Sequence, residues 1–597
     1  MKKIILIFTL LLVLVLVSCK KESNNTTESK KSANIEFNKM LDTYYQEDAK
    51  LKPLNATERG DDRYNNSFPN FLSDEYRNKS KVHYTKYLKD LNQFNDSDLT
   101  ESEKMSKEVL KWECEINLKG LDFRKDYLPI DQMWTVNLIM GQFASGTSAQ
   151  PFKTVKDYQN WLQRVNEYLV WLATAKEKMK EGMTLGYVLP KSLIVKIIPQ
   201  FEAIAKENVT SNLFYSPIKI MPESFSEKDK TALTIAYTNM LQNQIIPDYT
   251  DMYLFLKNDY LKKGRASSGI DAIPNGKAFY DYQIKKSTTT NMTADEIHQL
   301  GLKEVAQILS EMEKVKNEVG YKGQLKSFFN YVRTKKELMP YTAPQQVIDN
   351  FNAINRKMQP QLVKLFDVTP KSKFEVRRTE AFREKSSSIE YNPGSIDGTR
   401  PGIFYVPVPD VKSYNTFSDE ATFLHEAIPG HHYQISLQQE NTELPDFRKT
   451  SRYDGYGEGW ALYTESLGKE LGLYTDPYQY FGMLGLEMHR AIRLVVDTGL
   501  HSKGWTREQA IQYSLDNEAE SEENIISEIE RYMAEPGQAL SYKIGQLKII
   551  ELRAKATKEL GDKFDIKEFH NQILAPGCIP LALLEEHINN WIAVTKN

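Results

Sequence analysis

The apolar residues of this chain recur at the spacing of amphipathic helices. In residues 36–51, the residues Phe37, Met40, Leu41 and Tyr44 follow one another at i, i+3, i+4 and i+7, which places them on one helical face. The same periodicity predicts helices over 155–180, 508–515, 525–533 and 539–560. The pattern therefore indicates a mostly α fold.

Helix start signals support this interpretation. Thr293 and Glu296 have the spacing of a capping box, and the apolar pattern behind them runs to about residue 319. Thr416 and Asp419 form a similar start signal. Strand signals are sparse, so we expect only a small β element inside a helical body.

The best strand signal is the apolar run 402–409. Pro407 and Pro409 cannot donate to a ladder, so they favour an edge strand over a central one. Such an edge could hold an extended peptide by strand addition, or it could be a covered structural edge. The pattern leaves both alternatives open.

The first residues have the composition of a targeting segment. Two lysines precede the apolar run 4–17, which is too short for a comfortable membrane span, and residues 16–19 resemble a bacterial lipobox. We expect residues 1–19 to be a lipoprotein signal peptide with Cys19 as the lipidated residue; the alternative is a plain secretory signal. Lysines after Cys19, in place of the Asp that commonly causes inner-membrane retention, favour the outer membrane.

Beyond the signal peptide, the composition indicates one large globular body. Residues 20–35 are polar and predict a disordered tether, which leaves residues 36–597 as a single catalytic domain. Cys114 and Cys578 are the two other cysteines, too few for a disulfide framework. The net charge of −3 and the lack of a basic block exclude nucleic acid as an expected partner.

The chemistry gathers in the stretch 424–434. The chain has nine His, and three of them are His425, His431 and His432, with Glu426 directly after the first. Imidazole is the commonest zinc ligand, and a zinc protease also needs a carboxylate that takes a proton from water. The usual H-E-x-x-H motif separates its His by one helical turn. Here the separations are six and seven residues.

This spacing does not suit a straight helix. In a regular helix His431 would point about 120° away from His425, and His432 would lie about 10 Å further along the same face. Pro429 and Gly430 favour a kink or bulge, which would bring His431 back to a shared metal and leave His432 as an outer partner or a substrate contact. The alternative is an ordinary helix with surface or capping His.

A third ligand is expected further along the chain. Glu458 follows His431 by 27 residues and opens a helical stretch, as in proteases whose third ligand is a Glu on the next long helix. Glu465 lies two turns later, about 10 Å away, so it is too far to share the ion. It could instead orient a metal-binding His as an outer carboxylate.

With these residues in view, the chain resembles a large bacterial family of unknown function, often lipoproteins, that carries H-E-x-x-P-G-H-H followed by E-G-W-A-L-Y. The resemblance spans roughly residues 40–595 and includes the blocks 273–280, 288–290, 400–402, 490–501 and 531–545. That family is grouped with the thermolysin-like (gluzincin) zinc metallopeptidases and is similar to carboxypeptidase Taq and the oligopeptidases. The resemblance implies a mostly helical, two-lobed body around a deep cleft.

The later blocks contain candidates for supporting roles. Related enzymes use Tyr or His to stabilise the oxyanion, so Tyr542 and His501 are candidate donors. Arg490 could bind a substrate carboxylate or belong to a structural ion-pair network. Arg493 and Asp497 are four residues apart, which favours a structural ion pair.

The function that these residues predict is a zinc metallopeptidase. One zinc ion on His425, His431 and Glu458 would activate a water, and Glu426 would act as general base and then as proton donor to the leaving amine. The expected partners are a peptide substrate and, through the lipid only, a membrane. The alternatives are a non-catalytic peptide-binding or scaffold lipoprotein and a zinc hydrolase of a non-peptide amide.

Overall fold

The computed structural model describes residues 33–133, 135–380, 384, 387–396, 398 and 400–596. Helices build most of this part of the chain, which confirms the mostly α fold. The predicted signal peptide, Cys19 and nearly all of the predicted tether lie outside the described residues. Among the helices that are described, none combines the length and the apolar character needed to cross a membrane.

Up to residue 263, every named element of the described chain is a helix. The helices of this first part are α1 (Ile35–Leu51), α2 (Pro53–Glu58), α3 (Asp74–Leu91), α4 (Glu101–Gly120), α5 (Val136–Ala144), α6 (Val155–Leu185), α7 (Lys191–Lys206), α8 (Ser216–Lys219), α9 (Glu227–Met240), α10 (Ile246–Phe255) and α11 (Leu261–Lys263).

The second part contains the sheet and the remaining helices. These are α12 (Gly276–Thr288), α13 (Ala294–Glu318), α14 (Leu325–Thr334), α15 (Pro344–Met358), β1 (Phe374–Arg378), β2 (Glu390–Asn392), β3 (Gly402–Val406), α16 (Asp419–Glu426), α17 (His431–Glu440), α18 (Asp446–Lys449), α19 (Asp454–Ser466), α20 (Pro477–Ser502), α21 (Arg507–Asn517), α22 (Glu522–Ala534), α23 (Ser541–Leu560), α24 (Ile566–Leu574) and α25 (Leu581–Lys596).

The helices predicted from periodicity are present with small shifts at their ends. Helix α1 begins one residue before the predicted start, where the Asn34 side chain caps the helix by accepting from the Phe37 N–H. Thr293 and Glu296 form the predicted capping box at the start of α13. Helix α16 starts at Asp419 with Ser418 at its N-cap, so the start signal at Thr416 lies two residues too early.

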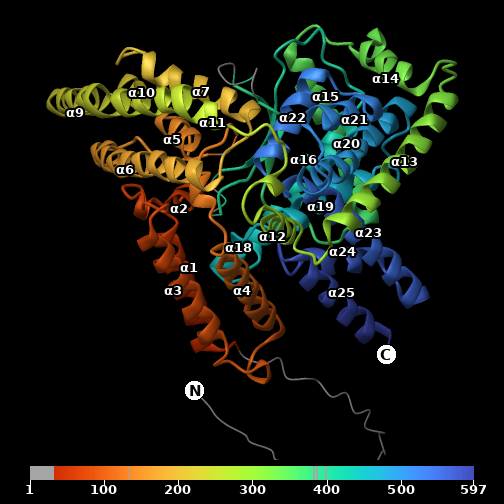
Figure 1. Cartoon of the computed structure of the whole chain (residues 1–597). Helices are drawn as coiled ribbons and strands as arrows, with labels where there is room; N and C mark the ends of the chain where they lie inside the picture. Colours follow the sequence, from red (N-terminus) through yellow and green to blue (C-terminus); the bar gives the residue numbers. More distant parts are fainter. Residues whose placement is uncertain are drawn as a thin grey trace, which may run out of the picture.

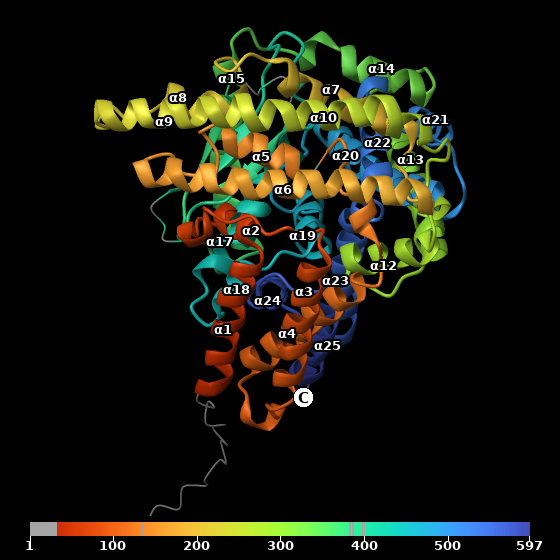
Figure 2. The same ribbon diagram turned by 60° about the vertical axis from the view of Figure 1, so that its left-hand side comes forward.

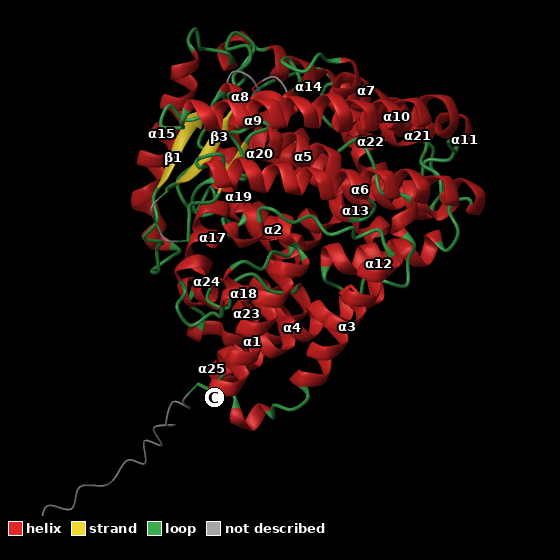
Figure 3. Ribbon diagram, turned by 90° about the vertical axis from the view of Figure 1, so that its left-hand side faces the viewer, coloured by secondary structure: helices red, strands yellow, loops and turns green. Residues whose placement is uncertain are grey.

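The prediction that 402–409 forms an edge strand is wrong. Strand β3 is the central strand of a three-stranded sheet, parallel to β1 on one side and antiparallel to β2 on the other. It ends at Val406, so Pro407 and Pro409 follow the ladder and interrupt no hydrogen bond of it. With both sides paired, β3 has no free edge for a peptide. Figure 3 shows this sheet as a small patch at the side of a helical body.

The described chain has two separate hydrophobic cores. One core lies among α5–α11 and holds large buried aromatics such as Trp161, Tyr168 and Tyr249. The other is larger and joins α1, α3 and α4 to the helices from α12 onward. Figures 1 and 2 show α6, α9 and α10 as a layer of long helices beside the rest of the body.

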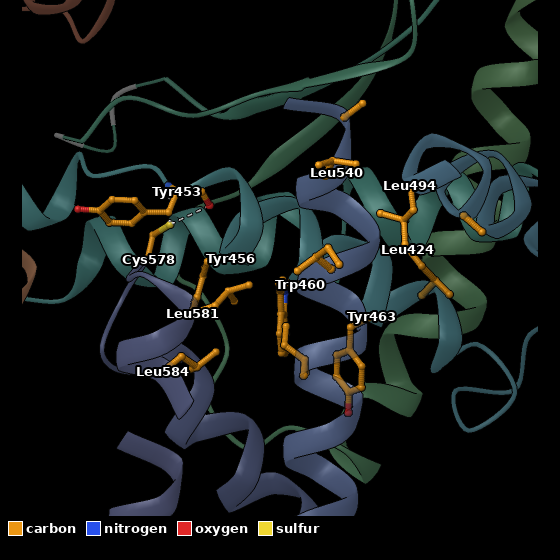
Figure 4. Close-up of a cluster of buried hydrophobic side chains, with 14 of the residues drawn as sticks. Leu424, Tyr453, Tyr456, Trp460, Tyr463, Leu494, Leu540, Cys578, Leu581 and Leu584 are labelled. Carbon is orange, nitrogen blue, oxygen red and sulfur yellow. Dashed lines mark hydrogen bonds between the residues drawn. The ribbon is translucent and has the colours of Figure 1, made fainter. Parts of the chain in front are cut away.

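Helix α19 lies at the centre of the larger core and packs directly against α23. The two helices approach closely because glycines face each other at the contact. A Cβ on Gly545 would lie 1.8 Å from the Gly455 carbonyl oxygen and 2.7 Å from the Gly459 Cα. Figure 4 shows the aromatic side chains of α19 among their neighbours, with Tyr456, Trp460 and Tyr463 beside leucines of other helices.

The glycine contact gives a stability prediction. Gly545→Ala should destabilise the fold by about 1–3 kcal/mol, because the added methyl group must push α19 and α23 apart. Thermal or denaturant unfolding measures the change. Gly457→Ala is the matched control on α19, since a Cβ there meets nothing within 4 Å. Equal unfolding midpoints for the two variants would show that the contact is not tight.

Candidate metal centre

The His cluster lies where two helices meet, not on one kinked helix. Helix α16 ends at Glu426 and α17 begins at His431, with four non-helical residues between them. A Cβ on Gly430 would lie 2.0 Å from the His425 carbonyl oxygen, so only glycine fits at this close approach. The chain turns back across the end of α16 and places the His431 side chain beside that of His425.

Helix α19 holds this break in position. The Trp460 indole Nε1 donates to the Pro429 carbonyl at 2.8 Å, and the Thr464 hydroxyl donates to the Leu424 carbonyl at 3.0 Å. Carbonyl groups at a helix end have lost their helical partners and need donors when they are buried. Both donor side chains are fully buried, so α19 is fixed against both sides of the break.

The break and α19 bring His425, His431 and Glu458 together. The Glu458 Oε2 lies 3.6 Å from the His425 Nε2 and 3.5 Å from the His431 Nε2, and one ligand atom from each residue fits within 4.8 Å of the others. Tetrahedral zinc with bonds of about 2.0–2.2 Å separates its ligand atoms by about 3.3–3.6 Å. The donor set and the two distances to Glu458 therefore fit one zinc ion.

Glu465 fixes the orientation of His425. Its Oε1 lies 2.7 Å from the His425 Nδ1, and its side chain is 1% exposed. With Nδ1 held by this carboxylate, Nε2 points to Glu458. A carboxylate behind a His is the usual outer support of a zinc ligand.

The charges around His425 favour a cation. Burial opposes protonation of this imidazole, but the hydrogen bonds with Glu458 and Glu465 outweigh it and raise its pKa to about 10. Burial would raise the pKa of Glu458, yet the charges and hydrogen bonds of His431 and His425 hold it well below its usual range. When no metal is bound, a proton on His425 balances part of the negative charge of Glu458 and Glu465.

Glu426 is half-buried at the end of α16, next to the cluster. Burial raises its pKa, while the neighbouring His425, His431 and Arg490 act in the opposite direction. No carboxylate–cation pair within 4 Å ties Glu426 to another described residue, so its carboxylate is available to a reactant.

Tyr542 is close enough to Glu458 for the charge of that carboxylate to act on its hydroxyl group. Burial and the negative charge of Glu458 raise its pKa to about 12, so the phenol keeps its proton at neutral pH. The Arg493 guanidinium stacks on the ring at 4.5 Å from its centroid and holds the ring in place. Tyr542 therefore keeps a hydroxyl group that can donate a hydrogen bond.

His501 does not have the role that the sequence suggested. It is fully buried on α20, its Nδ1 accepts from the Ile270 N–H at 2.9 Å, and its Nε2 lies 2.9 Å from the Tyr532 carbonyl. Both ring nitrogens are used by the backbone, and burial lowers its pKa to about 3. This neutral His joins three segments of the core and has no donor left for a substrate.

His432 also points away from the cluster. Its ring packs on Phe374 of β1, and its Nδ1 lies 2.8 Å from the Tyr391 hydroxyl of β2. Burial lowers its pKa to about 4, so it is neutral. The prediction of a substrate contact or outer partner is corrected, because this His attaches α17 to the sheet.

The predicted ion pair between Arg493 and Asp497 is absent. Arg493 pairs with Glu528 at 2.9 Å, while Asp497 accepts from the Tyr280 hydroxyl at 2.5 Å and from the Gly537 N–H. Each residue found a partner from a distant segment instead of its neighbour on the helix. Both roles are structural, as predicted, but through other contacts.

A cavity of about 590 Å³ lies beside the first residue of α19, Asp454. Its walls come from both hydrophobic cores, for example Leu72 on one side and Phe279 on the other. Asp454, one helical turn before Glu458, and Gln538 line it. The lining segments are far apart in the sequence, so no local pattern could reveal the cavity.

Comparisons with known proteins give a family and a fold. The model of the family described as "Bacterial protein of unknown function (DUF885)" matches residues 53–588. No curated protein matches the chain.

The solved structures that are similar to this chain include two bacterial proteins. One is described as a "putative lipoprotein" from Colwellia psychrerythraea, with 27% identity and a TM-score of 0.84, over 94% of this chain and 99% of the other. The second is described as a "putative lipoprotein of unknown function" from Shewanella oneidensis, with 17% identity and a TM-score of 0.74, over 93% of this chain and 99% of the other. The second likeness shows the fold alone.

The positions of the two neighbouring His give a first test of the site. His431→Ala should weaken zinc binding more than His432→Ala, because His431 faces Glu458 and His432 faces the sheet. For His432→Ala we expect a loss below the roughly 10–100-fold that is typical of outer partners. Zinc titration against a competing chelator measures both. The reverse order would make His432 the ligand.

The charge balance gives a second test. Zinc binds a neutral imidazole, so zinc binding should displace the proton of His425, whose pKa is about 10. The affinity for zinc should therefore rise about tenfold per pH unit from pH 7 to 9. Calorimetry in buffers of different ionisation enthalpy counts the protons. Glu465→Gln removes one of the groups that raise the pKa of His425. Zinc binding to this variant should therefore release fewer protons than zinc binding to the wild type. Affinity that is constant from pH 7 to 9 would contradict the assignment.

Proposed function

The chain belongs to the DUF885 family of bacterial proteins, whose function is unknown, and we propose that it is a zinc-dependent metallopeptidase of the thermolysin-like superfamily. The observation that carries the proposal is the spacing of His425, His431 and Glu458, which suits tetrahedral zinc. Glu426, adjacent in sequence to a ligand and free of a structural ion pair, adds the general base that a purely structural zinc site would not need.

The residues of the site suit the hydrolysis of a peptide bond. A zinc ion, when bound, polarises a carbonyl group and makes water more acidic. Glu426 accepts the proton of the attacking water and then passes it to the leaving amine. Glu465 keeps His425 turned toward the ligand cluster throughout, since its own carboxylate is buried and fixed.

Tyr542 supports the same reaction from the other side of the cluster. As the water adds to the carbonyl carbon, negative charge develops on the carbonyl oxygen and needs a donor. Tyr542 keeps its proton because its pKa is about 12, and the ring is already held by Arg493. It donates to this oxygen without a change of its own charge.

We further propose that the protein is a lipoprotein of the cell envelope. Residues 16–19 resemble a lipobox, and both similar solved structures are described with the words "putative lipoprotein". Lipid on Cys19 would anchor the enzyme, with the outer membrane favoured by the lysines that follow.

Two variants distinguish the loss of catalysis from the loss of zinc binding. Glu426→Gln should keep zinc and lose about 10²–10⁴-fold in turnover, because an amide cannot accept the proton. Glu458→Ala should lose zinc itself. Metal analysis and turnover of a peptide library measure the two effects, and Glu443→Gln, an exposed Glu, is the control.

Two results would contradict this assignment. Equal zinc content in the wild type and Glu458→Ala would remove Glu458 from the ligand set. Unchanged turnover in Glu426→Gln, or zinc without any hydrolysis in the wild type, would favour a non-catalytic lipoprotein.

A further inference from the structure

Among the described residues, Arg490 is a cation without an acidic partner, and it lies on the helix that packs against the helix of the candidate general base Glu426. It lies half-buried on α20, which packs against α16, and its charge acts on Glu426. Its Nη1 donates to the Leu486 carbonyl of its own helix at 3.3 Å, and its buried Nε has no acceptor. Within the described chain, no carboxylate lies within 4 Å of this guanidinium.

Two neighbouring arginines, in contrast, do have an acidic partner. Arg493, one turn further on α20, pairs with Glu528 at 2.9 Å, and Arg531 pairs with the same carboxylate at 2.9 Å. A buried guanidinium with unused donors is costly unless a partner arrives. The planar fork of arginine binds a carboxylate through two parallel hydrogen bonds. Arg490 can thus bind an anion, and the described residues do not supply one.

The chemistry of the reaction identifies that anion. Glu426 must reach the leaving nitrogen in order to protonate it. When the cleaved bond is the last one of a peptide, this nitrogen is separated from the terminal carboxylate carbon by a single Cα, a distance of about 2.5 Å. A cation beside Glu426 is then close to the terminal carboxylate. In the middle of a longer chain, the same place holds a neutral carbonyl.

We propose that Arg490 binds the C-terminal carboxylate of the substrate, which makes the enzyme a carboxypeptidase. This inference rests on the proposed function and adds the substrate class: peptides with a free C-terminus, cleaved at the last bond. Arg490 acts as the specificity residue and takes no part in proton transfer.

Binding to an inactive enzyme tests the inference directly. In the Glu426→Gln background, calorimetry compares a peptide that ends in a free carboxylate with the same peptide ending in an amide. We expect the free acid to bind about 10–100-fold more tightly, as for a charge-assisted hydrogen bond of about 1.5–3 kcal/mol. Adding Arg490→Met should abolish this preference, and Arg490→Lys should keep part of it.

Kinetics on the active enzyme provide the second measurement. Wild type should cleave the free acid with a higher kcat/KM than the amide, and Arg490→Met should lower that ratio toward one. Arg356→Met, an exposed arginine on α15, is the matched control and should leave the ratio unchanged. Zinc content and helical circular dichroism verify that each variant is folded. If Arg490→Met does not fold, Arg490→Lys and the ratio of kcat/KM for the free acid and the amide in the wild type test the inference.

The outcomes separate this inference from the proposed function. Equal binding and cleavage of the free acid and the amide by the wild type would overturn the carboxylate-binding role of Arg490. An Arg490→Met variant that loses binding of both peptides equally would also overturn it, because Arg490 would then bind a neutral carbonyl or only position Glu426. In either case peptide hydrolysis that depends on Glu426 would still support the peptidase. Failure of the peptidase itself appears separately, as turnover that Glu426→Gln does not change.

Discussion

The site depends on one constraint: the buried carbonyl groups at the break between α16 and α17 have no donor within a helix and need one from elsewhere. A buried carbonyl needs a donor, and Trp460 and Thr464 of α19 supply two of them. Once α19 is held there, Glu458 and Glu465 on the same helix can only face His425 from its two sides. The close glycine contact between α19 and α23 then seats this helix in the larger core. The ligand geometry is thus a consequence of backbone hydrogen bonding.

Electrostatics at the site follow from this arrangement. His425 lies between two carboxylates, so a positive charge is favoured at its position, either a proton or a metal ion. On α20, Arg493 shares the carboxylate of Glu528 with Arg531, whereas Arg490 has no carboxylate within 4 Å among the described residues and is the cation that we propose for the substrate carboxylate. Helix α20 therefore contributes both the scaffold that holds Tyr542 and the cation next to Glu426.

Local features of this protein could be predicted from its sequence, and long-range ones could not. Helix periodicity and the capping box at Thr293 act within a few residues, so the helices were found. The His-Glu cluster was visible because Pro429 and Gly430 exclude a regular helix. The central position of β3 depends on strands 10 and more residues away, and the backbone partners of His501 come from residues 270 and 532. No spacing within a motif contains such information.

The three neighbouring roles of His425, His431 and His432 show how strongly the backbone decides what a residue type can do. The same imidazole is a candidate ligand at 431 and a neutral packing group at 432, because one residue of α17 faces α19 and the next faces the sheet. Had α16 continued as a regular helix, His432 and not His431 would have shared the face of His425. Gly430 is the position that prevents this, since its backbone lies against the His425 carbonyl where no side chain fits. A cluster of chemically suitable residues therefore becomes a possible metal centre only through a glycine that has no chemistry of its own.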